Sequence, residues 1–362
     1  MFFQQHFLHL PSRYLSGAIG NGGFSTRGRR RTSSDIADYV RRVGDQRKTK
    51  RQLDKETIRQ KDKFKSIMNR RQFTKKTLMA SAMASMVRIP EIPVFPFRSL
   101  KKGIMWGSIG FGRTIMDKFQ AAKDAGFDGV QVMSHFNRDE VLKARDETEL
   151  PVSSVCSAVH WKFPLSDPDP KIRQEGLDAL KVTLEDASVY GADTILFVPG
   201  RVNETVSYDD CWTRSSSELK KIIPLAEKLN VKIAVENVWN NFLLSPVEAK
   251  MYVDQFQSPY LCFFFDCGNV LVYGWPEQWI RILGERIARI HIKEYSLKIA
   301  NKQGKAAGFG VKLLEGDVNW SAVMKALDDT GYTGWTTIEQ PGGDTPEGLK
   351  DLCDRLGVIH KS

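Results

Sequence analysis

The chain has 362 residues, 41% of them apolar, and is long enough for one large domain or two ordinary ones. Its net charge of +10 is uneven: residues 1–102 carry 24 Lys and Arg against 7 Asp and Glu, whereas residues 103–362 carry 29 against 36. The acidic balance of the larger part argues against a nucleic-acid-binding surface there, and the lack of an apolar run of 18 residues argues against a membrane span.

The first 102 residues divide into two basic segments. Residues 1–67 contain Gly/Ser/Arg-rich and highly charged stretches that could form little core, so we expect a disordered basic extension. Residues 68–102 are predicted to be a signal and linker, because the stretch from Met68 to Lys76 reads MNRRQFTKK and resembles a twin-arginine export signal. The sequence ASAMA that follows shortly after offers cleavage sites of the A-x-A type.

This signal bears on the start of the chain and on its location. Met68 stands where an initiator would stand, so our hypothesis is that translation begins there and that residues 1–67 are a mis-assigned extension. A working signal would export the protein to the periplasm, whereas without one it would be cytoplasmic. The alternative interpretation is a basic linker in which Arg70 and Arg71 are adjacent by chance.

The cysteines form no CxxC pair, and their number is odd. Three of them fall in or beside apolar runs, which indicates buried free thiols rather than a disulfide framework or a thiolate metal site. The five are Cys156, Cys211, Cys262, Cys267 and Cys353.

From residue 103 onward, short apolar runs alternate with stretches of helical periodicity, which is typical of βα units around a parallel sheet. The expected strands are Gly103–Ile109, Gly129–Ser134, Val152–His160, Thr194–Gly200, Val231–Val238, Leu261–Asn269, Ala288–Ser296 and Gly334–Gln340. The expected helices are Asp117–Gly126, Lys171–Gly191, Ser215–Leu229, Pro246–Phe256, Pro276–Arg286, Ser321–Gly331 and Pro346–Leu356. Several helices end in Gly or Asn before the next strand, as α/β units commonly do.

Residues 103–362 are therefore predicted to be a (β/α)₈ TIM barrel of the α/β class, since the strand count and the length both fit. A doubly wound open sheet is the alternative. No GxGxxG motif follows the first expected strand, which argues against a dinucleotide site of that kind.

Four consecutive expected strands, the fifth to the eighth, close on metal-binding side chains. These are Glu236, Asp266, His291 and Glu339, each set among apolar neighbours. Burying a polar group without a partner costs about 2–7 kcal/mol, and burying a charged carboxylate costs more. One divalent cation could be the partner of all four side chains. Three carboxylates and one imidazole suit one Mn²⁺, with Mg²⁺, Co²⁺ or Zn²⁺ as alternatives. A lone strand-end acid is more often a helix cap or an ion pair, but four at the same end of a barrel indicate a metal site.

These segments resemble the xylose-isomerase-like barrels, and in particular their sugar or sugar-phosphate isomerase and epimerase branch, which includes ketose 3-epimerases and hexulose-6-phosphate isomerase-like proteins. The resemblance covers residues 101–359. It is carried by VENVWN from Val235, FDCGN from Phe265, HIK from His291, EGDVNW from Glu315, and Glu339.

The resemblance implies that Glu236, Asp266, His291 and Glu339 bind the metal and that Glu236 and Glu339 also form the acid/base pair. In such a site, one glutamate removes a proton beside a ketose carbonyl to give a metal-bound enediolate, and the other returns a proton on the opposite face. It further implies a sugar or sugar phosphate as substrate. Ketose 3-epimerisation is the expected reaction. Whether the protein forms a homo-oligomer is left open.

Four further residues are candidate substrate contacts. Lys293 shares a strand face with His291 and could contact the substrate or form a structural ion pair. His160 could hydrogen-bond a sugar oxygen, or could pack or cap at the end of the third strand. Trp106 could form an apolar wall for the sugar or pack in the core. Asn269 stands where many ketose 3-epimerases have a histidine, which leaves the identity of the sugar open.

Other functions are compatible with parts of this pattern. An inosose-dehydratase-like lyase would share the metal site. An endonuclease IV-like DNA-repair enzyme would need several more histidines and a basic face, whereas residues 103–362 hold four histidines and an acidic balance. A sugar-binding protein without turnover would not need both glutamates. Asp317 or Asn319 is expected to cap the helix that begins near Trp320.

Overall fold

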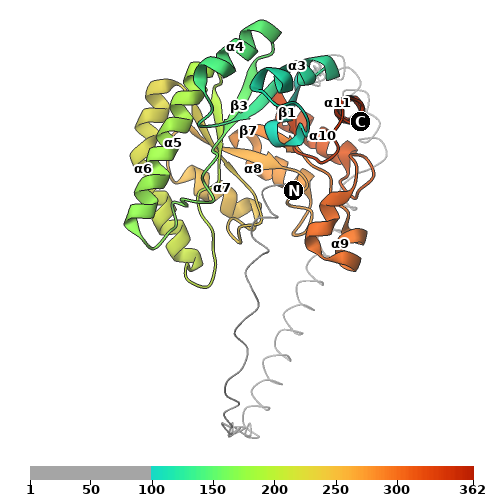
Figure 1. The fold of residues 1–362 in the computed structure, drawn as a ribbon. Coiled ribbons are helices and arrows are strands. Elements are labelled where there is room, and N and C mark those ends of the chain that lie inside the picture. Colours follow the sequence, from blue (N-terminus) through green and yellow to red (C-terminus); the bar gives the residue numbers. More distant parts are fainter. Residues whose placement is uncertain (1–98) are drawn as a thin grey trace, which may run out of the picture. The chain divides into compact units, whose positions relative to one another are not determined.

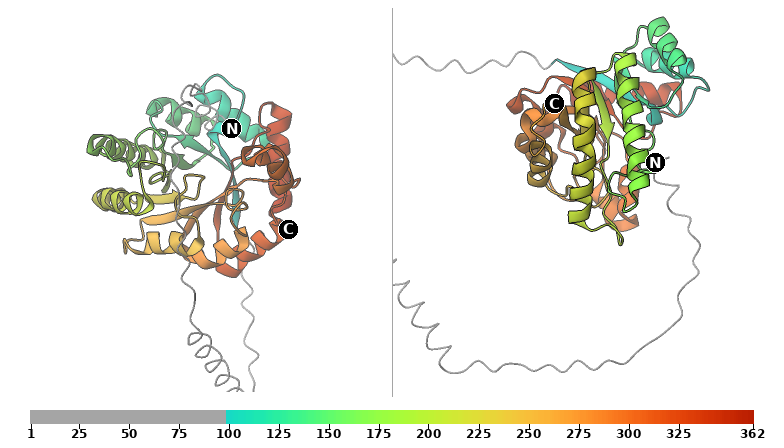
Figure 2. Two further views of the ribbon diagram at one scale, coloured as in Figure 1. Left: turned by 90° about the horizontal axis from the view of Figure 1, so that it is seen from below. Right: turned by 90° about the vertical axis from the view of Figure 1, so that its left-hand side faces the viewer.

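The computed structural model describes residues 99–362; the expected basic extension and twin-arginine signal lie outside the described residues. In the described part, eight parallel strands pair in sequence order and close into a barrel, with β8 beside β1. Helices surround the barrel on its outside (Figures 1 and 2). The predicted TIM barrel is thereby confirmed.

Each expected strand is present, with small shifts at its ends. The strands are β1 Leu100–Met105, β2 Gly129–Met133, β3 Val152–Cys156, β4 Thr194–Phe197, β5 Lys232–Glu236, β6 Leu261–Asp266, β7 Ile287–Ile292 and β8 Gly334–Ile338. The barrel begins three residues earlier than expected, because Lys101 and Lys102 pair with Trp335 and Thr336 and so help to close it.

The helices alternate with the strands, as expected. They are α3 Ile115–Ala125, α4 Arg138–Thr148, α5 Pro170–Tyr190, α6 Tyr208–Leu229, α7 Pro246–Asp254, α8 Pro276–Leu283, α9 Leu297–Gln303, α10 Trp320–Thr330 and α11 Pro346–Ile359. Short 3₁₀ turns lie at Trp106–Ser108 (η3), Gly284–Arg286 (η4) and Lys305–Gly310 (η5). The α4 and α9 helices were not among the expected segments.

Local signals set several helix ends. Thr114 and Asp117 form a capping box at the start of α3, and Asn319 caps α10 through its side chain, as one of the two expected residues. The expected glycine stops are confirmed: Gly126 and Gly191 follow α3 and α5 with φ of 92° and 79°. These caps fix where the chain turns back toward the next strand.

Alternation along each strand separates two cores. Outward side chains such as Val130, Ile233 and Ile290 pack against the helices. Inward side chains form a smaller cluster in the barrel lumen, consisting of Met105, Met133, Cys156, Leu196, Ala234, Cys262 and Phe264. The lumen is tight where β1 meets β8: a Cβ at Gly103 would lie 2.5 Å from Thr337 Oγ1, so only glycine fits there. The lumen thus forms an apolar floor beneath its C-terminal mouth.

The five cysteines are all buried and free, as predicted. Among residues 99–362, no helix combines the length and the apolar character needed to cross a membrane.

Candidate metal centre

The four predicted ligands meet at the C-terminal end of the barrel. Glu236 and Asp266 are the last residues of β5 and β6, His291 is the next-to-last residue of β7, and Glu339 directly follows β8. One ligand atom from each lies within 4.8 Å of the others. Because the strands are parallel and each of these residues points into the lumen, four positions far apart in the sequence converge on one point.

His291 lies at the centre of the cluster. Its Nδ1 is 2.8 Å from Glu236 Oε1, 3.0 Å from Glu339 Oε2 and 3.9 Å from Asp266 Oδ2. The two glutamates reach this nitrogen from strands β5 and β8, with β6 and β7 between them. The carboxylates therefore converge on the side of the imidazole ring that carries Nδ1.

Lys293 completes the charge pattern. Its Nζ lies 3.0 Å from Asp266 Oδ2 and 2.8 Å from Glu339 Oε2, and it stands 5.4 Å from the centre of the Phe309 ring. The lysine is thus held by two of the candidate ligands. Both roles expected for it, an ion pair and a contact in the site, are consistent with this position.

A hydrogen-bond network fixes the orientation of Asp266. Its amide nitrogen donates to Asn237 Oδ1 at 2.9 Å, and Asn237 Nδ2 donates back to the carbonyl oxygen of Asp266 at 2.9 Å. The amide nitrogen of Asn269 donates to Asp266 Oδ1 at 2.7 Å. One carboxylate oxygen is thus held by the backbone, while Oδ2 points toward His291 and Lys293.

Burial and mutual attraction shift the pKa values of these groups in different directions. Burial raises the pKa of Glu236 to about 7 against the attraction of His291. Burial would lower the pKa of His291, but Glu236 and Glu339 outweigh it and raise this pKa to about 9. Burial would raise the pKa of Glu339, yet Lys293 and His291 lower it below its usual range. Three carboxyl groups thus share two cationic side chains, so the cluster can take up a further positive charge.

These residues fit a divalent cation. Asp266 Oδ2 is buried and accepts no well-aligned hydrogen bond, although Lys293 Nζ lies close by. Together with Glu236, Glu339 and His291 Nδ1, it forms an oxygen-rich set with one nitrogen, the type of donor set that Mn²⁺ and Mg²⁺ accept. Because Asp266 Oδ2 accepts no well-aligned hydrogen bond in this buried cluster, it keeps a lone pair available for a cation.

Two further predicted residues, Asn269 and Trp106, differ in how closely they contact this cluster. Asn269 is buried; its Nδ2 donates to Asn237 O at 2.9 Å, and its Oδ1 is 3.5 Å from Lys293 Nζ. Trp106 is partly buried in η3, with its ring 5.0 Å from that of Phe136. Asn269 therefore supports the site directly, whereas Trp106 packs against other aromatic rings.

His160 lies beyond the position expected for it. The third strand ends at Cys156, so His160 follows it in a turn instead of closing the strand. The side chain is buried, its Nδ1 has no hydrogen-bond partner, and its ring packs edge-on against Trp161 and Phe197. Burial lowers the pKa of His160 to about 3, against the opposing effect of the Glu339 charge, so it is neutral near pH 7.

Two residues of the site were not identified from the sequence. Gln131 on β2 is fully buried, and its Oε1 lies 2.7 Å from His291 Nε2. Glu294 accepts hydrogen bonds from the amides of Leu314 and Val318 and from Trp320 Nε1, and so anchors the loop before α10. Glu294 could have been recognised from the sequence, because it directly follows the charged segment of His291 and Lys293.

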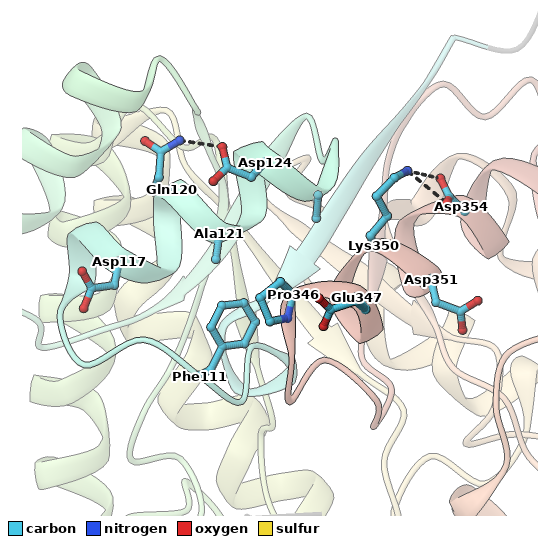
Figure 3. A pocket seen from close by; sticks show the side chains of 11 residues that line it. Phe111, Asp117, Gln120, Ala121, Asp124, Pro346, Glu347, Lys350, Asp351 and Asp354 are labelled. Atoms are coloured by element: carbon cyan, nitrogen blue, oxygen red, sulfur yellow. Dashed lines mark hydrogen bonds and ion pairs between the residues drawn. The ribbon is translucent and has the colours of Figure 1, made fainter.

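A separate groove lies between α3 and α11 on the outside of the barrel (Figure 3). It has a volume of about 690 Å³ and contains none of the four candidate ligands. Its aspartates are already engaged: Asp117 accepts backbone hydrogen bonds, while Asp124, Asp351 and Asp354 pair with Gln120, Arg355 and Lys350. We therefore place the chemistry at the barrel mouth and not in this groove.

Comparison with known proteins identifies epimerases among the relatives of this chain. Among curated proteins, the chain is 26% identical over 259 residues to the L-ribulose-5-phosphate 3-epimerase UlaE of Escherichia coli O1:K1, which covers 67% of this chain and 87% of that protein. The UlaE protein of Salmonella paratyphi A is 24% identical over 258 residues, with the same coverage. These relatives are epimerases, which are isomerases, in agreement with the enzyme class expected from the sequence.

Solved structures share the fold. The apo form of the E. coli 3-keto-D-glucoside 4-epimerase YcjR superimposes with a TM-score of 0.61 at 18% identity, covering 73% of this chain and all of that one. An L-ribulose 3-epimerase gives a TM-score of 0.61 at 15% identity, covering 72% of this chain and 95% of the other. The model of the xylose isomerase-like TIM barrel family matches residues 119–357. The chain belongs to the xylose isomerase-like TIM barrel family.

Proposed function

We propose that this protein is a divalent-metal-dependent ketose 3-epimerase. The observation that carries the proposal is the convergence of Glu236 and Glu339, from separate strands, on one imidazole nitrogen of a four-ligand cluster. The proposal is supported by the 3-epimerase relatives, whose sequence match extends over 67% of this chain. Mn²⁺ is the proposed cation, since three of the four ligands are carboxylates.

The chain's own residues would carry the proton transfers. One glutamate, as the carboxylate, accepts the proton from C3 of the ketose, and the electron pair of the broken C–H bond enters an enediolate. The other glutamate, as the carboxylic acid, gives its proton to the opposite face of C3, which inverts the configuration. Each turnover leaves the two glutamates with exchanged protonation states, and proton exchange with solvent restores them.

Neighbouring groups would position the substrate and limit the charge. The cation, when bound, supplies a Lewis acid that polarises the substrate carbonyl. Lys293 Nζ, held by Asp266 and Glu339, provides a positive charge close to the oxygens of the enediolate. The expected sugar contacts of Asn269, His160 and Trp106 are part of this proposal. Asn269 lies beside Lys293, whereas the rings of His160 and Trp106 pack against other aromatic rings.

Deuterium exchange tests this function. The full chain, loaded with Mn²⁺, would be incubated in D₂O with free ketoses and ketose phosphates, with and without EDTA, and followed by proton NMR. We expect EDTA-sensitive deuterium at C3 together with the C3 epimer, and the panel identifies whether a phosphate is required. Deuterium at C1 or C2 would indicate an aldose–ketose isomerase instead, and loss of water from the substrate a lyase.

We also propose, from the sequence alone, that residues 68–87 direct twin-arginine export, with translation starting at Met68. The pair Arg70-Arg71, the following Phe73 and Lys75 and the run of small residues support this. Fractionation of cells expressing the wild type and an Arg70→Lys, Arg71→Lys variant tests it: export should fail in the variant. Equal distribution of the two proteins would contradict export, and N-terminal sequencing of the unprocessed protein identifies the start.

A further inference from the structure

We propose that Gln131 is a positioning residue that keeps His291 in the form able to bind the cation through Nδ1. This inference rests on the proposed metal-dependent function. Gln131 lies on β2 and His291 on β7, and the hydrogen bond between them, with 2.7 Å between Oε1 and Nε2, joins two strands 160 residues apart in the sequence. Both side chains are buried, at 0% and 1% exposure, so water does not compete for this bond.

The chemistry of the amide decides which imidazole nitrogen carries the proton. An amide oxygen only accepts, so the Oε1 of Gln131 requires a proton on His291 Nε2. A neutral imidazole with its proton on Nε2 has its lone pair on Nδ1. Nδ1 is the nitrogen that faces Glu236 and Glu339, so when a cation occupies the cluster, the contact from β2 keeps the lone pair of Nδ1 directed toward that cation.

A second contact restricts the orientation of the ring. The Phe264 ring lies with its centre 4.4 Å from that of His291, and the two planes are inclined by 54°. Gln131 holds one edge of the imidazole and Phe264 packs against its face. Together they limit rotation of the ring, which would otherwise move Nδ1 away from Asp266 and the two glutamates.

The neutrality of Gln131 also suits its surroundings. Met105 is its register partner on β1 and Met133 lies on the same face of β2, and neither side chain can pair with a charge. A glutamate at this position would preserve a hydrogen-bond acceptor for Nε2 but would add another negative group to the acidic mouth. An acceptor without charge fixes the imidazole proton and adds no further charge to the lumen.

The neighbouring strand offers a matched control. Ser154 on β3 is the register partner of Gln131, is fully buried, and has a hydroxyl oxygen without a hydrogen-bond partner in the structure. Replacing it by alanine removes a buried polar group beside Gln131 without removing any contact to His291. A loss caused by general disturbance of the lumen would therefore appear in both variants.

Titration of the full chain with Co²⁺, followed by calorimetry and by the visible absorption of the bound ion, tests the inference. Gln131→Met keeps the volume but removes the acceptor, and it should weaken Co²⁺ binding about 10–100-fold, the usual effect of losing such a contact to a ligating histidine. Gln131→Glu restores the acceptor and should bind within about fivefold of the wild type. Ser154→Ala should bind like the wild type.

Four outcomes would overturn the inference. Wild-type affinity in Gln131→Met, or an equal loss in Ser154→Ala, would show that Gln131 does not position the ligand. If the wild type itself binds no Co²⁺, the proposed metal-dependent function fails together with the inference. If the wild type binds Co²⁺ but the variants do not differ as expected, only the inference about Gln131 fails. A measurement on the wild type avoids any folding defect: ¹⁵N-histidine NMR of the Zn²⁺-loaded protein should show His291 protonated at Nε2, and a proton on Nδ1 would overturn the inference.

Discussion

The two halves of the barrel contribute different chemistry to its mouth. From β5 to β8, each strand ends at or beside a titratable candidate ligand: Glu236, Asp266, His291 and Glu339. From β1 to β4, the inward residues near the strand ends are Met105, Met133, Cys156 and Leu196, which belong to the apolar lumen cluster. The first half adds Gln131, a neutral residue, to the contacts of His291.

This difference shows how the fold accommodates several buried charges. The charged half lets carboxylates, imidazole and the Lys293 ammonium neutralise one another over distances near 3 Å. The apolar half places buried, uncharged side chains beside this cluster, and a surrounding of low dielectric constant strengthens electrostatic interactions. The comparison predicts that changes in the second half affect catalysis and metal binding, whereas changes in the first half act through positioning and stability.

The largest effect should come from removing an acid/base group in the charged half. Glu339→Gln keeps an oxygen that can bind the cation but cannot transfer a proton, so we expect kcat for C3 epimerisation to fall by about 10²–10⁴-fold. Rates of C3 deuterium exchange and calorimetric metal affinity would be measured together. The exposed Glu140 on α4 provides the matched Glu140→Gln control, which should keep wild-type activity. A Glu339→Gln variant with near wild-type turnover would contradict the proposed mechanism.

Removing the metal should lower the stability of the folded state, and its local effect should differ between the two halves of the barrel. At a cation concentration of 100 times Kd, binding stabilises the folded state by about 2.7 kcal/mol, which EDTA should abolish together with activity. Hydrogen exchange should then quicken in peptides that contain the ends of β5 to β8, with little change at the ends of β1 to β4. Equal quickening around the whole barrel would show that the cation is not held by one half.

Lys293 should distinguish a charge-balancing group from a metal ligand. Lys293→Met leaves the buried carboxylate of Asp266 without its cationic partner, which should destabilise the metal-free protein by about 3 kcal/mol. The cation can replace this positive charge, so the increase in Tm on adding Mn²⁺ should be larger than in the wild type, while kcat falls. A smaller Tm increase in the variant would mean that Lys293 assists cation binding instead.

The smallest effect is expected in the apolar half, at His160. Its pKa is about 3 in the folded protein and about 6.5 in an unfolded chain, so the unfolded state binds more protons between these values. Stability due to this group is complete above pH 6.5 and is lost as the pH falls toward 3; over the first pH unit below 6.5 the loss is at most about 1.4 kcal/mol. Urea unfolding of His160→Gln from neutral to mildly acidic pH should show a flatter dependence, and curves parallel to the wild type would contradict this assignment.

The sequence predicted the barrel well because its strands are apolar runs and its helices end at glycines. It predicted the ends of some strands too far along: β3 was expected to reach His160 but ends at Cys156, where the chain turns. The sequence pattern did not predict α4, because this helix buries only Val141, Ala144 and Thr148 and its apolar face is narrow. The α9 helix buries no residue at all, which leaves no periodic apolar pattern to recognise.

The part of the candidate site that lies at strand ends could be predicted from the sequence. The convergence of the four candidate ligands could be predicted because parallel strands bring their carboxyl ends to one mouth. Gln131 could not be found this way, since it lies in the middle of β2 and its partner is 160 residues away. Only the closed geometry of the barrel brings the two residues together across the lumen.

The most direct test of the account is a crystal structure of the Mn²⁺-loaded protein with anomalous scattering recorded for manganese. We predict a single strong peak at the barrel mouth, bound by Glu236, Asp266, Glu339 and the Nδ1 of His291. A peak elsewhere, a peak bound through His291 Nε2, or no peak in protein that shows epimerase activity would contradict the central claim that these four strand-end residues form the metal site.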